Sequence, residues 1–166
     1  MEGNSLRTGM MVVFVVALLI PGSVVTAGEA KGKVSFKGKT ATVKYAYLVK
    51  GPDDVDTETT IRRVILSQND IAAKIQACTT MKCSTNDLTE GATVDLDAGP
   101  RLNYWVTLND QLVQHSGTEE TTALKTTKNE PGRLAGTLHI DDTASDGPKV
   151  EAEFDAALLK EFTAAR

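Results

Sequence analysis

The sequence predicts an all-β fold, mainly antiparallel, in the form of a β-sandwich or an open barrel of about seven to nine strands with one short helix. Three observations support this prediction. Apolar and polar residues alternate with a period of two along most of the chain after residue 30. Glycine, asparagine and aspartate interrupt these segments at short intervals, as they do in tight turns. The pattern also lacks the regular strand–helix alternation that is typical of parallel sheets.

The N-terminal segment 1–27 is predicted to be a secretory signal peptide. A basic residue, Arg7, precedes an apolar run over residues 10–20, and small residues precede a cleavage point after Ala27. Cleavage after Ala30 is the alternative. The apolar run is shorter than the roughly 20 residues that a membrane-spanning helix needs. We therefore expect a secreted or periplasmic protein with no membrane span after cleavage.

The remaining residues, 28–166, are predicted to form a single β-rich domain. Hydrophobic residues make up 41% of the chain, which is enough for a core, and Trp105 is expected among its few large side chains. The net charge of −4 argues against a nucleic-acid-binding protein, which usually carries a basic face. The sequence has no cofactor or metal motif, so we expect neither group.

The domain is predicted to begin with a β-hairpin. Residues 33–37 and 41–47 both alternate, and Gly38-Lys39 between them fits a two-residue turn with glycine in the first central position. This turn predicts two facing pairs, Phe36 with Ala41 and Val34 with Val43. The apolar residues of both strands then lie on one face of the sheet.

A polar loop over residues 51–56 is followed by a predicted strand at 60–67, which is apolar on both faces toward its end. Capping residues at 67–70 then precede the one predicted helix, 71–78. One face of this helix carries Ile71, Ile75 and Cys78.

Two further strands are predicted at 92–97 and 102–108, joined by the short loop 98–100. Asn109-Asp110 is read as a second tight turn, leading into a strand at 111–115. A two-residue turn at this point predicts that Val106 faces Val113 and that Tyr104 faces His115.

The C-terminal part contains a short predicted strand at 122–126, followed by clearer strands at 134–140 and 150–158. The tail 159–166 is expected to form a helical turn or a frayed end. The polar side of the last strand carries three acids, which we expect to face Arg133 or Lys149 across the sheet: Glu151, Glu153 and Asp155.

Cys78 and Cys83 are the only cysteines, and in an exported protein such a pair is typical of a disulfide. The ring is small, so the bond is expected to hold a local bend rather than to add much stability. A redox-active or metal-binding pair would need a tighter spacing or further ligands nearby.

Short motifs near both ends of the domain resemble a set of uncharacterised small secreted bacterial β-rich proteins. They are the hairpin around Gly38-Lys39, the following Ala46-Tyr47, the strand end 64–67, and two closing strand segments, 136–138 and 151–156. The resemblance implies an exported β-rich domain. It implies no activity and assigns no functional residue.

Candidate chemical groups are few. His115 and His139 are the only side chains whose ordinary pKa lies near neutrality, and a surface or packing role is expected for each. Acidic residues cluster in two loops, where calcium binding is an alternative to an ordinary polar loop. The first cluster is Asp53, Asp54, Asp56 and Glu58, and the second is Asp141, Asp142 and Asp146.

No catalytic residues are predicted, because the sequence contains no recognised nucleophile or metalloprotease motif. The favoured hypothesis is an exported non-catalytic domain that binds a partner, such as an envelope or extracellular protein, or supports an assembly. Its interaction surface would be an edge strand or an apolar patch. One alternative is a small metal-dependent or His/carboxylate hydrolase that uses His115 or His139. Another alternative is a secreted inhibitor or toxin-like protein.

Overall fold

The computed structural model describes residues 27–166, so the predicted signal peptide lies outside the described residues except for Ala27. The described part is almost entirely antiparallel β-structure with a single α-helix, as the sequence predicted. No helix within residues 27–166 is both long enough and apolar enough to cross a membrane.

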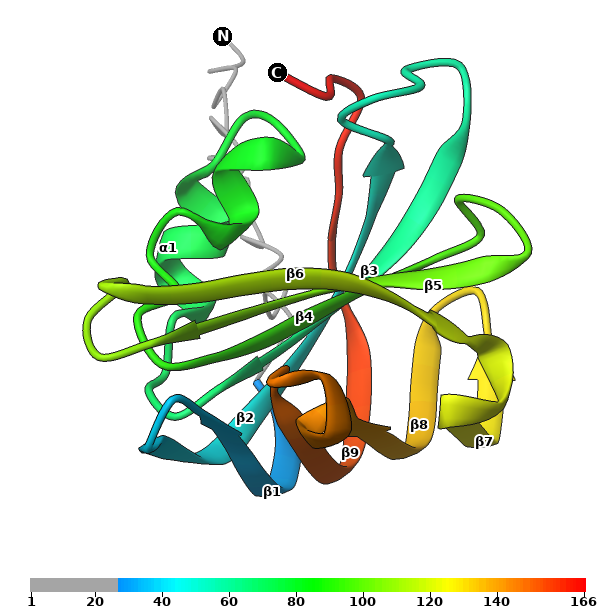
Figure 1. The fold of residues 1–166 in the computed structure, drawn as a ribbon. Helices are drawn as coiled ribbons and strands as arrows, with labels where there is room; N and C mark the ends of the chain where they lie inside the picture. The colour runs from blue at the N-terminus through cyan, green and yellow to red at the C-terminus, as the bar shows by residue number, and fades with distance from the viewer. Residues whose placement is uncertain (1–26) are drawn as a thin grey trace, which may run out of the picture.

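Nine strands form one sheet that curls into a half-barrel (Figure 1). The strand order across the sheet is β6-β5-β4-β3-β2-β1-β9-β8-β7, and β2 also pairs in parallel with the end of β9. The strands are β1 (Gly28–Phe36), β2 (Lys39–Pro52), β3 (Thr60–Ser67), β4 (Gly91–Leu96), β5 (Arg101–Leu108), β6 (Val113–Glu120), β7 (Leu124–Glu130), β8 (Arg133–Asp141) and β9 (Lys149–Glu161). The helix is α1 (Ala72–Ala77), and short 3₁₀ turns are η1 (Lys82–Thr85), η2 (Thr121–Ala123) and η3 (Thr143–Ser145).

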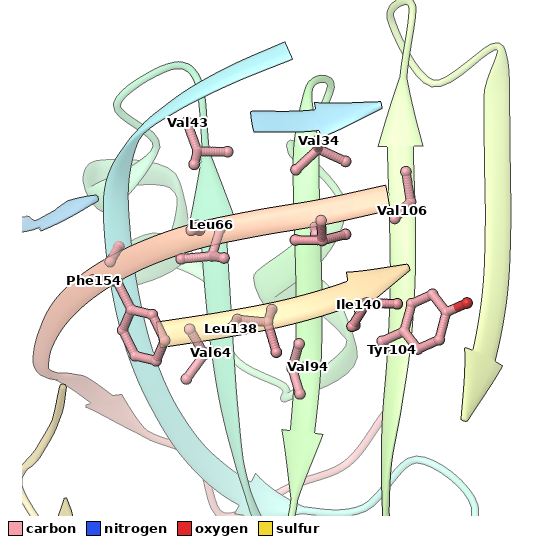
Figure 2. Close-up of a cluster of buried hydrophobic side chains, with 14 of the residues drawn as sticks. Val34, Val43, Val64, Leu66, Val94, Tyr104, Val106, Leu138, Ile140 and Phe154 are labelled. Atoms are coloured by element: carbon pink, nitrogen blue, oxygen red, sulfur yellow. The ribbon is translucent and has the colours of Figure 1, made fainter. Parts of the chain in front are cut away.

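The curl brings distant strands face to face around an inner core. Figure 2 shows β8 and β9 running across β3, β4 and β5, with their apolar side chains between the two layers. Leu138 and Phe154 on one side meet Val64, Val94 and their neighbours on the other. These residues come from the alternating segments, so the period-two pattern correctly identifies which side of each strand is buried.

A second, outer core lies on the opposite face of β2 and β3, where α1 and the segment after it cover the sheet. The predicted helix face is confirmed, because Ile71, Ile75 and Cys78 are all buried there. This cover also explains the sequence of β3, which places Val64 in the inner core and Ile65 in the outer one. A strand covered on both faces must be apolar on both.

The predicted register of the first hairpin is wrong by two residues. The turn consists of Lys37 and Gly38, both with positive φ (47° and 72°), and not of Gly38-Lys39. Phe36 therefore pairs with Lys39, and Val34 pairs with Ala41. Glycine occupies the second central position, where a type I′ turn accepts it. Because the error is an even number of residues, the same side chains still face the inner core.

The second predicted hairpin is also out of register. Its turn spans four residues, 109–112, and Asn109, Asp110 and Gln111 all adopt positive φ. Val106 consequently faces His115, and Tyr104 faces Gly117. A Cβ atom at Gly117 would lie only 2.6 Å from the Tyr104 hydroxyl, so this register depends on glycine opposite the large ring.

The C-terminal tail is neither helical nor frayed. β9 continues to Glu161 beside β2, and the amide of Phe162 donates a hydrogen bond to the Lys50 carbonyl at 2.7 Å. Phe162 and Ala165 are buried, and Figure 1 shows the tail running back past the β2–β3 connection.

Three smaller predictions also need correction. The short strand predicted at 122–126 begins later, because residues 121–123 form η2 and β7 starts at Leu124. The loop predicted from residue 51 begins at 53, since Gly51 and Pro52 pair with β3. Trp105, expected in the core, is 39% exposed on the outer face of β5.

Candidate functional site

A concave feature with buried charge lies around Trp105, on the outer face of β3, β4 and β5. We call it the Trp105 groove. It encloses about 530 Å³, within the size range of small-ligand sites. Side chains that line it include Asp54, Arg63, Lys82, Asn86, Thr93 and Trp105.

The floor of the groove is built on an ion pair between neighbouring strands. Arg63 on β3 and Asp95 on β4 face each other in the sheet, and both are almost fully buried. The guanidinium donates two hydrogen bonds to the carboxylate, Nε to Oδ1 at 2.6 Å and a second nitrogen to Oδ2 at 2.7 Å. Such two-point pairing holds a planar guanidinium in a defined orientation.

The pKa shifts of this pair have separate causes. Burial acts to lower the pKa of Arg63, but the hydrogen bonds and charges of Asp95 and Asp54 raise it above its ordinary value. Burial raises the pKa of Asp95, against the opposing influence of Arg63. The raised pKa of Arg63 favours its charged form, whereas the raised pKa of Asp95 favours its neutral form. We assign both groups as charged, because each Asp95 oxygen accepts a hydrogen bond from the cation.

Asp54 belongs to the loop between β2 and β3 and carries the one buried side-chain polar atom that lacks a hydrogen-bond partner within residues 27–166. Its Oδ2 lies 3.6 Å from an Arg63 nitrogen, whereas its Oδ1 is buried without any hydrogen-bond partner. Arg166 anchors this loop by donating a hydrogen bond to the Asp54 carbonyl at 2.6 Å. Because Oδ1 of Asp54 has neither a partner within residues 27–166 nor contact with solvent, leaving it unpaired costs free energy.

Trp105 is the aromatic element of the groove. Its ring centroid lies 5.8 Å from the central carbon of the Arg63 guanidinium, which places the cation within reach of a cation–π interaction. In the sheet it pairs with Thr93 and Ser116, two small polar residues that leave the indole accessible. Trp105 is also the only tryptophan of the sequence, so its fluorescence reports on this groove alone.

Segments far apart in the sequence hold the walls of the groove in place. The predicted disulfide is confirmed: Cys78 and Cys83 are bonded, with their Cα atoms 5.5 Å apart, and the bridge ties α1 to η1. The amides of Met81 and Lys82 donate to the carbonyls of Ala164 and Ala165 in the C-terminal tail. On the opposite wall, the Gln111 side chain donates to main-chain carbonyls of residues 86 and 88 at 2.8 and 3.2 Å.

A second polar cluster joins the two ends of the curled sheet. The Tyr104 hydroxyl, at the end of the inner core, donates a hydrogen bond to Oδ2 of Asp142 in the loop between β8 and β9. Burial, then this bond, raises the pKa of Tyr104 well above its usual range. Burial also raises the pKa of Glu119 on β6 above its ordinary value of 4.5, and the facing Asp142 carboxyl adds to the shift.

The raised pKa of Glu119 predicts a pH effect on stability. A group whose pKa is higher in the folded state stabilises the fold below its unfolded pKa, and this contribution is lost as the pH rises through the folded pKa. Glu119→Gln should therefore gain melting temperature relative to the wild type as the pH is raised from 4 to 7. Thermal unfolding of both proteins across this range measures the difference. Asp142, Tyr104 and Arg101 surround the carboxyl and are unchanged in the variant.

The matched control is Glu120→Gln, because Glu120 is exposed and faces Arg101 at 3.5 Å rather than Asp142. Acids with lowered pKa values, such as Asp155 beside Arg133, act in the opposite sense but contribute equally to all three proteins. A constant difference between Glu119→Gln and the wild type from pH 4 to 7 would contradict the assignment.

The structure does not bring the two histidines together. The His115 ring packs against Phe36 and Tyr104, with ring centroids 5.1 and 5.9 Å apart, which is a packing role. His139 is exposed on β8, with Nδ1 3.5 Å from a Glu151 oxygen.

Several of the acidic residues have structural partners. Three of the loop acids, Asp53, Asp56 and Asp141, accept local hydrogen bonds, as in the bond from Thr59 to Asp56 at 2.6 Å. On β9, Asp155 is opposed across the sheet by Arg133, as predicted. Lys149 lies 3.2 Å from Glu151 but belongs to β9 itself, so the prediction that it faces the acids from a neighbouring strand is wrong. Within residues 27–166, no three His, Cys, Asp or Glu side chains are placed to hold a metal ion.

The sequence did not identify the groove, although one signal was present. Arg63 is a charged residue directly before residues 64–66 of β3, which are apolar on both faces of the sheet. Such a residue must be paired when it is buried, so an acid on a neighbouring strand was required.

Comparison with known proteins found no match for this chain among family models, curated proteins or solved structures.

Proposed function

We propose that this protein is an exported, non-catalytic β-domain that binds a small ligand in the Trp105 groove. One observation carries the proposal: a half-exposed indole lies beside a buried ion pair and an unpartnered carboxylate oxygen. A concave site with a few convergent polar groups is the usual form of a ligand-binding pocket. The sequence alone favoured an edge strand or an apolar patch as the interaction surface, and the groove offers a more specific one.

A binding role fits the groove better than a catalytic one. Arg63 and Asp95 satisfy each other through two hydrogen bonds, so neither is free to move a proton. The residues that line the groove include no histidine and no cysteine, the side chains that most often act as general base or activated nucleophile near neutral pH. The remaining groups offer hydrogen bonds and an aromatic surface.

The binding role is tested by mapping the surface of the domain with a library of small organic fragments, followed by nuclear magnetic resonance of the ¹⁵N-labelled protein. We expect the fragments that bind to shift the Trp105 indole signal and the amides of Asn86 and Gln111 together. Trp105→Ala should abolish these shifts. The control, Leu112→Ala, alters a side chain that is 81% exposed in the β5–β6 turn, outside the groove, and should retain them. Fragment binding that is spread evenly over the surface would contradict a site.

Export is proposed from the predicted signal peptide and is supported by the disulfide, which persists in oxidising compartments. We expect the intact mass of the exported protein to correspond to a chain that begins at Gly28. In β1, Gly28 pairs with Ala46 of β2, and Ala30 pairs with Phe154 of β9. Cleavage after Ala30 would remove these pairings. A mass that begins at Met1, with all protein retained in the cytoplasm, would refute export.

A further inference from the structure

We propose that the ligand of the Trp105 groove is a neutral saccharide, with a sugar ring packed on Trp105 and its hydroxyl groups bonded to the surrounding side chains. This inference rests on the proposed function and names its ligand class. It follows from the charge balance of the groove, from its unused hydrogen-bonding groups and from its aromatic surface.

The charges in and beneath the groove cancel. Arg63 is neutralised by Asp95, which lies behind it in the sheet. Of the other lining residues, Lys82 carries a positive charge and Asp54 a negative one. An anion or a cation would gain little net attraction from such a site. A neutral polar ligand matches it.

The unused hydrogen-bonding groups suit hydroxyls. Asp54 lines the groove, and its carboxylate accepts no hydrogen bond from residues 27–166, since Oδ1 has no partner and Oδ2 lies 3.6 Å from Arg63. The side chains of Asn86, Thr93 and Thr107 make no hydrogen bonds to other protein groups in the described part of the chain, and each can both donate and accept. A sugar hydroxyl also donates and accepts, so a ring with several hydroxyls can satisfy these groups at once.

Trp105 supplies the apolar surface that such a ring needs. One face of a pyranose presents C–H groups, and burying them on an indole removes apolar surface from water. Trp105 is 39% exposed, so part of its indole surface is open to a ligand. Burial of Arg63 against it fixes the ring position without closing the groove.

The test is titration of the mature protein with cellohexaose, chitohexaose and mannohexaose, each to about 10 mM, with Trp105 emission as the signal. This range detects weak binding, since a Kd of about 1 mM corresponds to a binding free energy of only about −4 kcal/mol. We expect a saturable change in emission with at least one of the three. Asp54→Ala and Asn86→Ala should each weaken that affinity by about tenfold, as expected for the loss of one hydrogen bond to the ligand. Asn86 is exposed, so its variant folds normally. Leu112→Ala, outside the groove, should bind as the wild type does.

The outcomes separate the ligand class from the binding role. No response to any of the three hexaoses would overturn the saccharide proposal, and positive fragment mapping of the same groove would leave the binding role intact. A hexaose response that survives both Asp54→Ala and Asn86→Ala unchanged would place the sugar elsewhere and would also overturn the proposal. Failure of both the sugars and the fragments would refute both proposals.

Discussion

Arg63→Met should lower the free energy of unfolding by about 3–5 kcal/mol, the usual result of removing one partner from a buried ion pair. Methionine keeps most of the apolar stem but leaves the Asp95 carboxylate buried without its two hydrogen bonds. Asp95 is 3% exposed, so water cannot replace the lost guanidinium. Urea unfolding of the wild type and the variant measures the effect.

Two further variants test the physical reason. The double variant Arg63→Met/Asp95→Leu removes both charges and should recover most of the lost stability, because an apolar pair can replace a buried ion pair at little net cost. Arg62→Met is the control on the same strand, because its partner Asp97 is 45% exposed and stays hydrated when the guanidinium is removed. Its cost should be well below that of Arg63→Met, on the order of 1 kcal/mol. Equal losses for Arg62→Met and Arg63→Met would contradict a buried pair.

Phe162→Ala should also lower the free energy of unfolding by about 3–5 kcal/mol, the typical cost of truncating a buried phenylalanine. Phe162 is 4% exposed and belongs to the outer core with Met81 and Val49. Its loss should also loosen the tail that receives hydrogen bonds from Met81 and Lys82, and thereby the wall of the groove. Urea unfolding gives the stability, and hydrogen exchange of the Lys82 amide gives the local effect.

The matched control is Thr163→Ala, the next residue, which is exposed and makes no side-chain hydrogen bond in the described part of the chain. It should change stability by no more than about 0.5 kcal/mol. If Phe162→Ala were as mild as Thr163→Ala, the C-terminal tail would be frayed in solution, which was one of the two alternatives that the sequence left open.

The two hairpins show what periodicity can and cannot predict. It assigned Val34, Phe36, Ala41 and Val43 to one buried face, and the structure confirms this. It did not give the register, since a shift of two residues leaves every side chain on the same face. The choice depended on the turns, where Lys37 and Asn109 adopt left-handed conformations that the residue types only weakly indicate.

The tail was mispredicted for a different reason. Residues 159–166 have no clear alternation, and their burial depends on contacts with β2 and with the segment at Met81, which are remote in sequence. Trp105 was misplaced because its size suggested the core, whereas the polar side of an alternating strand was the better guide to its exposure.

The sequence by itself determined the antiparallel β class, the single α-helix, the buried side of most strands and the disulfide, because these follow from local periodicity, from capping and turn residues, and from the presence of only two cysteines. Only the tertiary structure decided the curl of the sheet and the assembly of the Trp105 groove. The groove combines Asp54, Arg63, Lys82 and Trp105 with a wall held by the C-terminal tail. Such a site depends on how separate segments pack in three dimensions, and no local pattern records that packing.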